Sequence, residues 1–234
     1  MTRSPLILEP LFMIGPVPIT RPVVTTWAIM AVLTLFGLLL RAHLANRPGK
    51  LQSAAELVTE AIDHQISEVL QRDPAPYRAL VGTVFLFILV ANWSSLMPGT
   101  EPPTATLETD AALALIVLAS TIWFGIRVQG VAGYFATFAQ PSWAMIPLNL
   151  LEQITRAFSM IVRLFGNIMS GVFVVGIVLS LAGLLVPIPL MALDLLTGAV
   201  QAYIFAILSC VFIGAAVNGE NDPPQDEHRK WDTT

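Results

Sequence analysis

The chain has 234 residues, of which 55% are hydrophobic and 12% are charged, and its mean hydropathy is +0.72. Soluble domains have about 25% charged residues, so this composition excludes an ordinary soluble domain and indicates an integral membrane protein. The net charge of −4 says little about function, but the lack of a basic patch in the sequence excludes binding to nucleic acid.

Five apolar stretches are long enough to cross a bilayer, which requires about 20 residues. The expected transmembrane helices are residues 23–42, 79–97, 110–128, 147–186 and 189–217. We predict an all-α integral membrane protein, a single membrane domain over residues 1–234 with about five transmembrane helices and a long, steeply tilted C-terminal helical hairpin.

The segments outside these spans are short. Residues 1–22 form an outer N-terminal segment, and residues 46–78 form an inner amphipathic segment in which apolar residues recur at helical spacing opposite a mixed-charge face. Pro74 and Pro76 are expected to end that helix. Residues 129–146 are too short and broken to span, so an interfacial re-entry is expected there, and residues 218–234 form an inner polar tail.

The distribution of Lys and Arg predicts the orientation. If the N-terminus lies outside, Arg3 and Arg21 are the basic residues on that side. Eight lie on the opposite side: Arg41, Arg47, Lys50, Arg72, Arg78, Arg127, Arg229 and Lys230. The excess predicts a multi-pass protein with its N-terminus outside and its C-terminus in the cytoplasm.

The fourth apolar stretch is unusually long. Its 40 residues would form a helix of about 60 Å, twice the thickness of a hydrocarbon core of about 30 Å. Either the helix is steeply tilted and lies against a large partner surface, or it breaks at a glycine. The candidate break points are Gly166, Gly171, Gly176 and Gly183.

A polar stripe runs along this long helix. Its members fall within an arc of about 80° on a helical wheel: Asn149, Glu152, Arg156, Ser159, Arg163, Asn167 and Ser170. Glu152 and Arg156 have the spacing of an ion pair within one helix, but Arg163 has no carboxylate nearby, since none occurs between Glu152 and Asp194. A buried charge of this kind costs about 2.5 to 3.5 kcal/mol, which indicates a transport pathway or a counter-ion on another chain.

Arginine at this position provides a permanent cation. Such a cation favours the ionised form of a mobile carboxylate, displaces the proton or metal cation bound to it, and blocks the direct passage of small cations. Three other classes fit the sequence poorly. A secondary transporter usually pairs broken helices across a repeat, a selective channel needs filter loops, and an intramembrane protease needs catalytic side chains in the spans, whereas His43, His64 and His228 lie outside them.

Two motifs carry a family resemblance. The stretch "NLLEQITRAFSMIVRLFGNIMSG" (149–171), followed by "QAYIFAIL" (201–208), resembles subunit a of the rotary F-type ATP synthases. The resemblance covers residues 80–217 well. The stretch 81–115 looks like the alternative N-type branch of that family.

The resemblance implies a role for each matching residue. Arg163 corresponds to the family's essential arginine, which faces the ion-carrying carboxylates of a rotating ring of c subunits and separates two offset aqueous half-channels. Gln201 and Asn167 correspond to polar residues near that arginine. Positions assigned to the inner half-channel are matched by Glu152, Arg156 and Ser159.

The implied partners are the c-subunit ring, the peripheral-stalk b subunits, the rest of the ATP synthase complex and membrane lipid. The implied location is a bacterial or archaeal plasma membrane. The chain itself is expected to hold no catalytic residue, metal or cofactor. A secondary cation transporter with one charged site at mid-membrane is the alternative.

The chain departs from the family pattern on the outer side. Many members have Glu and His where this chain has Val172 and Asp194. Asp194 either supplies an ionisable group from the opposite helix or lies at the wet interface near the "VPIP" corner at 186–189. Further departures are Thr106, Glu108 and Ala157. These departures leave undecided which residues line the outer pathway. They also leave undecided whether the ion is a proton, the family default, or sodium.

Overall fold

The computed structural model describes residues 10–14, 17–42, 49–96, 100, 102–138, 146–183 and 186–218. Five of its helices are long and apolar enough to cross a membrane, which confirms the predicted all-α integral membrane fold. The expected inner tail from residue 219 onward lies outside the described residues, as do residues 1–9 and the basic residues Arg47, Arg229 and Lys230. The helices are α1 (Arg21–Ala42), α2 (Lys50–Leu70), α3 (Ala75–Trp93), α4 (Leu107–Phe138), α5 (Ile146–Ala182) and α6 (Pro187–Asn218), with 3-10 turns η1 (Ser94–Leu96) and η2 (Pro103–Ala105).

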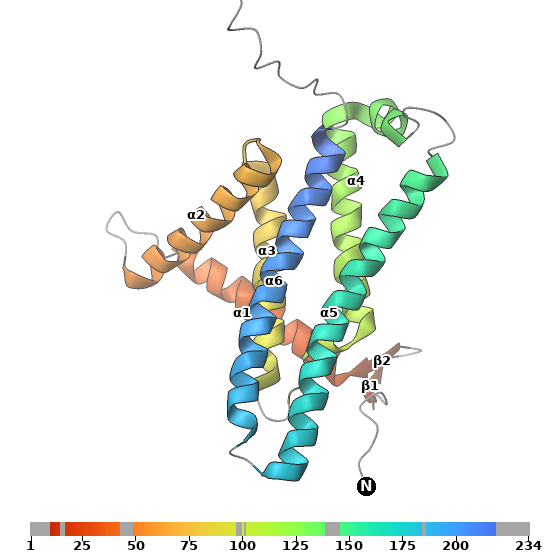
Figure 1. The fold of residues 1–234 in the computed structure, drawn as a ribbon. Helices are drawn as coiled ribbons and strands as arrows, with labels where there is room; N and C mark the ends of the chain where they lie inside the picture. Colours follow the sequence, from red (N-terminus) through yellow and green to blue (C-terminus); the bar gives the residue numbers. More distant parts are fainter. Residues whose placement is uncertain are drawn as a thin grey trace, which may run out of the picture.

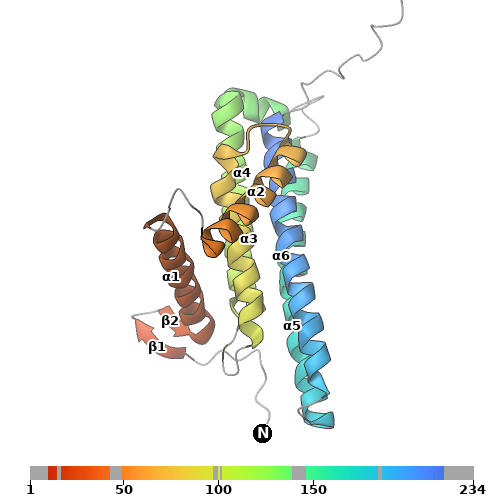
Figure 2. The same cartoon turned by 90° about the vertical axis from the view of Figure 1, so that its left-hand side faces the viewer.

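A short β-hairpin precedes the helices and was not anticipated from the sequence. Strands β1 (Pro10–Ile14) and β2 (Val17–Thr20) pair antiparallel, with Ile14 opposite Val17. The hairpin leads directly into α1, which lies at the edge of the bundle (Figures 1 and 2) and contacts α3. Among its described residues, α1 buries only Pro22 and Ile29.

Helix α6 is the centre of the bundle. It packs against α2, α3, α4 and α5, and Figure 2 shows α5 and α6 side by side as a hairpin, with α3 and α4 on one side of it. In the 18-residue apolar stretch of α6 more than half of the residues are buried, compared with 6% in the corresponding stretch of α1. Helix α6 therefore organises the others.

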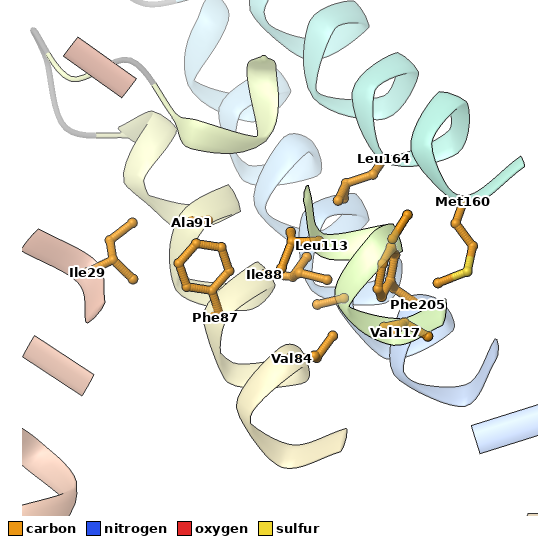
Figure 3. Close-up of a cluster of buried hydrophobic side chains, with 12 residues drawn as sticks. Ile29, Val84, Phe87, Ile88, Ala91, Leu113, Val117, Met160, Leu164 and Phe205 are labelled. Atoms are coloured by element: carbon orange, nitrogen blue, oxygen red, sulfur yellow. The ribbon is translucent and has the colours of Figure 1, made fainter. Parts of the chain in front are cut away.

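The largest core cluster joins five helices (Figure 3). Phe87 and Ile88 of α3, Leu113 and Val117 of α4, and Phe205 of α6 meet there. Helix α5 contributes two buried side chains, Met160 and Leu164, which lie one turn apart on the same face. These two residues fix which side of α5 faces the bundle.

Helix α2 follows the predicted amphipathic pattern. Ile66 and Leu70 are fully buried against α3 and α6, and polar residues occupy the opposite face. Arg78 of α3 forms an ion pair with Asp63 of α2, and the Tyr203 hydroxyl of α6 donates to Oε1 of Gln65 at 2.8 Å. The helix is thus tied to two of the spanning helices.

The turn between α2 and α3 is shorter than expected. Helix α2 ends at Leu70, and α3 begins at Ala75, four residues before the predicted start of the second span. Pro74 is the N-cap of α3 and Pro76 lies in its first turn, where a missing N–H costs nothing. The two prolines therefore start α3 as well as separating it from α2.

Helix α4 is bent at Gly130. This residue has φ +75° and ψ 164°, a conformation open mainly to glycine. Gln129 donates its Nε2 to the Ala216 carbonyl of α6 at 2.8 Å. The break falls where the interfacial segment was expected to begin, but the chain beyond it is helical to Phe138, and residues 139–145 lie outside the described part.

Helix α5 is continuous over 37 residues. Its interior glycines do not break it, and it ends immediately before Gly183, whose φ of +74° suits glycine. At 1.5 Å per residue the helix is about 55 Å long. Of the four candidate break points, Gly166, Gly171 and Gly176 lie within the continuous helix, so a break there is wrong, whereas the helix does end at Gly183. The tilt stays a prediction.

Candidate functional site

The register between α5 and α6 places the motif residues at a common depth. Gly171 of α5 lies against Asp194 of α6, so closely that a Cβ on Gly171 would be 2.8 Å from the Asp194 carboxyl carbon. The two helices run antiparallel (Figure 1). Seven residues away on each helix, Leu164 is therefore level with Gln201. Arg163 and Gln201 lie at the same height in the hairpin.

Arg163 points away from the core of its own chain. Its neighbour Leu164 is completely buried, whereas Arg163 is exposed. No carboxylate or hydrogen-bond acceptor within the described residues contacts its guanidinium. The side chain thus presents an unneutralised cation on the outer face of α5.

Two amides lie near this cation on the inner side of the hairpin. Gln201 is 7% exposed, and Asn167 lies one turn along α5 from Arg163. The Nε2 of Gln201 and the Nδ2 of Asn167 are buried and have no hydrogen-bond partner in the described structure. Buried polar atoms are usually satisfied, so unpaired ones often mark places where water or an ion is accommodated.

Glu152 and Arg156 form the ion pair that their spacing allows. The guanidinium of Arg156 also lies 5.4 Å from the ring centroid of Phe212 on α6, within the range of a cation–π interaction. Ser159, one turn before Arg163, is exposed. Polar groups therefore continue from Arg163 toward the N-terminal end of α5.

A cavity of about 300 Å³ lies at the other end of the hairpin. Asp194 lines it, together with Gly171 and Val172 of α5 and Thr106 at the start of α4. Asp194 thus lies in the wall of a partly open cavity, about two turns into α6. Its other lining residues are Pro22, Ser95, Leu96, Thr100, Pro102, Ala105, Met169, Val175, Gly176 and Met191.

Sequence reasoning missed two buried polar features close to this cavity. The Thr104 hydroxyl donates to Oδ1 of Asn92 at 2.8 Å, and the Asn92 amide donates to the Gly198 carbonyl at 2.9 Å. Asp110 is fully buried in the first turns of α4. The third span was expected to begin at residue 110, and nothing in the composition of the run "TLETD" (106–110) shows that its last residue faces inward.

These features define a class of protein: a multi-pass helical membrane protein with an unpaired arginine on a long helix, at the level of a buried glutamine and between two polar regions. The chain belongs to the ATP synthase A chain family, whose sequence profile matches residues 23–214.

Curated relatives agree with this assignment. The chain is 54% identical over 217 residues to "ATP synthase subunit a 2" of a Bradyrhizobium species, covering 93% of this chain and 97% of the relative. It is 41% identical over 213 residues to "ATP synthase subunit a" of Albidiferax ferrireducens, covering 90% and 92%. With "ATP synthase subunit a 2" of Acaryochloris marina, it shares 40% identity over 204 residues, covering 86% and 87%. The family resemblance is confirmed, while the N-type branch stays a prediction.

Proposed function

We propose that this chain is the ion-translocating stator subunit in the membrane sector of a rotary ATP synthase. In this role the chain itself neither makes nor hydrolyses ATP. It exchanges an ion between two half-channels and the carboxylates of a rotating c-subunit ring. The observation that carries the proposal is the exposed Arg163, a permanent cation with no acid of the described chain to neutralise it.

The electrostatics of Arg163 suit unloading of a carrier. At an effective dielectric constant of about 20, opposite unit charges about 4 Å apart attract by about 4 kcal/mol. That energy favours the ionised form of a passing carboxylate by about a thousandfold. The carboxylate therefore loses its ion as it meets Arg163, and the same fixed charge keeps free cations from crossing between the half-channels.

The two polar regions are the natural half-channels. The cavity beside Asp194 serves as the outer half-channel. Its acidic side chain comes from Asp194 of α6, because α5 has Val172 and no acid at this level. Glu152, Arg156 and Ser159 border the inner one, with Asn167 and Gln201 beside Arg163 between the two regions. Inward and outward transfer are then separated along α5.

The orientation follows from the basic residues. Arg72 donates its Nε to Oδ1 of Asn218 at 2.8 Å, so the turn between α2 and α3 lies at the same end as the C-terminal end of α6. We assign this end, which carries Arg72 and Arg78, to the cytoplasm. The Asp194 cavity at the opposite end then opens outward.

The partners in this role are the c-subunit ring on the Arg163 face, the peripheral-stalk b subunits and the rest of the complex. The proposal includes the N-type branch and leaves the ion as H⁺ or Na⁺, since the ion's ligands lie mainly on the ring. The ring sequence from the same genome would decide between them.

The test is replacement of Arg163 in the complete complex. Arg163→Ala should assemble and abolish ATP-driven ion pumping into inverted vesicles, because nothing then unloads the carrier or blocks leakage. Arg127→Ala, an exposed arginine on α4, is the matched control and should pump normally. Coupled pumping by Arg163→Ala would reject the proposal. Transport by the purified chain alone in liposomes would favour the secondary transporter instead.

A further inference from the structure

We propose that Asp110 of α4 is a proton-relay residue between the outer cavity and the level of Arg163. The inference rests on the proposed function with H⁺ as the transported ion, and it goes beyond that function because it adds a residue of α4 to the pathway.

Asp110 lies at the depth of Arg163 and Gln201. A Cβ on Gly125 of α4 would be 3.1 Å from the Ala216 carbonyl of α6, and the two helices run in the same direction (Figure 1). Fifteen residues earlier on each helix, Asp110 is level with Gln201. The carboxyl group therefore lies in the layer of the bundle that holds the arginine.

The unpaired buried polar atoms of this layer include both hydrogen-bond acceptors and hydrogen-bond donors. Within the described residues, four buried side-chain atoms lack a hydrogen-bond partner: Oδ1 and Oδ2 of Asp110, Nδ2 of Asn167 and Nε2 of Gln201. Two are carboxyl oxygens and two are amide donors. They come from α4, α5 and α6, which all pack against one another. Packing alone does not explain why these four atoms lie in one layer, because leaving a buried polar group unpaired destabilises the fold.

The layer is one helical turn from the outer cavity. The Asp110 N–H donates to the carbonyl of Thr106 at 3.3 Å, and Thr106 lines the cavity. On α5, Asn167 lies one turn from Gly171, which lines it too. A proton in the cavity is thus separated from Asp110 by a single turn of α4.

Among the described polar side chains of this layer, only the Asp110 carboxyl group can take up and release a proton at neutral pH. In its neutral form it accepts a proton at one oxygen while the hydroxyl on the other releases one, so it returns to its starting state and no other reactant is needed. An ionised form without a partner at full burial would be costly. Asn167 and Gln201 can donate hydrogen bonds to the acid but cannot exchange a proton at neutral pH. They act as positioning residues.

A matched pair of substitutions tests the relay. Asp110→Glu and Asp110→Gln add the same methylene and differ only in whether an acid is present. In the assembled complex in inverted vesicles, ATP-driven pumping by Asp110→Gln should be about a hundredfold slower than by Asp110→Glu. Pumping by Asp110→Asn, which keeps the native side-chain size, should be as slow as pumping by Asp110→Gln. ATP hydrolysis by the detached soluble head is the control for intact catalysis.

The outcomes separate a relay from a structural role. Equal pumping by the Glu and Gln variants, at whatever rate, or normal pumping by Asp110→Asn would overturn the proposal, because amide and acid would then be interchangeable. Difference infrared spectroscopy of the complex gives a second readout: a protonated carboxyl band that is absent in Asp110→Asn supports the relay, and an unchanged spectrum opposes it. If Arg163→Ala abolishes pumping while Asp110→Asn pumps normally, the relay fails and the rotary function stands.

Discussion

The close approach of Gly171 to Asp194 allows a sharp test of the outer cavity. In Gly171→Ala the new Cβ would lie 2.8 Å from the carboxyl carbon of Asp194, whereas ordinary van der Waals contact begins at 3.4 Å. Oδ1 of Asp194 lies closer still to that position, so the carboxyl group must rotate or move away, by at least 0.6 Å at its carbon, or the two helices must separate. Overpacking of this kind costs about 1 to 3 kcal/mol.

Gly176→Ala is the matched control. Gly176 lies on the same helix and lines the same cavity, but a Cβ there meets nothing within 4 Å. Both substitutions gain the same helix propensity, about 1 kcal/mol. The difference between the two variants thus isolates the contact with Asp194.

Two measurements on the purified complex read out the effect. We expect Gly171→Ala to lower the midpoint of thermal unfolding in detergent relative to Gly176→Ala, and to slow ATP-driven pumping severalfold while Gly176→Ala pumps normally. In an Asp194→Ser background, where the obstructing carboxyl is gone, adding Gly171→Ala should cause no further loss. If the two alanine variants are indistinguishable in both assays, the inferred packing of Asp194 is wrong.

Two further predictions concern stability. Thr104→Val should destabilise the protein by about 1 to 3 kcal/mol in thermal or denaturant unfolding, because it leaves Oδ1 of Asn92 buried without a donor. The control, Thr121→Val, removes a hydroxyl that bonds only within its own helix and should cost less. Equal losses of stability in the two variants would contradict this reasoning. Gly130→Ala should cost about 1 to 3 kcal/mol by forcing a side chain into a conformation that suits glycine, whereas Gly133→Ala in the regular helix should be neutral or stabilising, so tolerance of both would show that the bend can relax.

The features that the sequence predicts well depend on composition over many residues. The five spanning helices are examples, because a length of about 20 apolar residues is set by the bilayer itself. The exposed position of Arg163 was also predictable, since no acid of the chain is near it in sequence and the polar stripe fixes its face of the helix. The Glu152–Arg156 pair depends only on local spacing.

Features that depend on contacts between distant segments could not be predicted. Asp110 is completely buried although it lies in the first turn of α4, and no local pattern distinguishes it from an acid in an exposed first turn. The position of Asp194 in a cavity wall depends on its fit against Gly171, 23 residues earlier. The bend at Gly130 needs a glycine, but many glycines in this chain sit in regular helix, so the residue type alone does not mark it.

The central place of α6 has a consequence for how the protein is made. Ribosomes deliver a chain from its N-terminus, yet here the helix against which α2, α3, α4 and α5 all pack emerges after all four of them. Until α6 is inserted, the earlier helices lie in the lipid without the surface against which they pack, so the bundle can close only after α6 has been made. Termination of synthesis before residue 187 would therefore leave these four helices without the helix that they all contact.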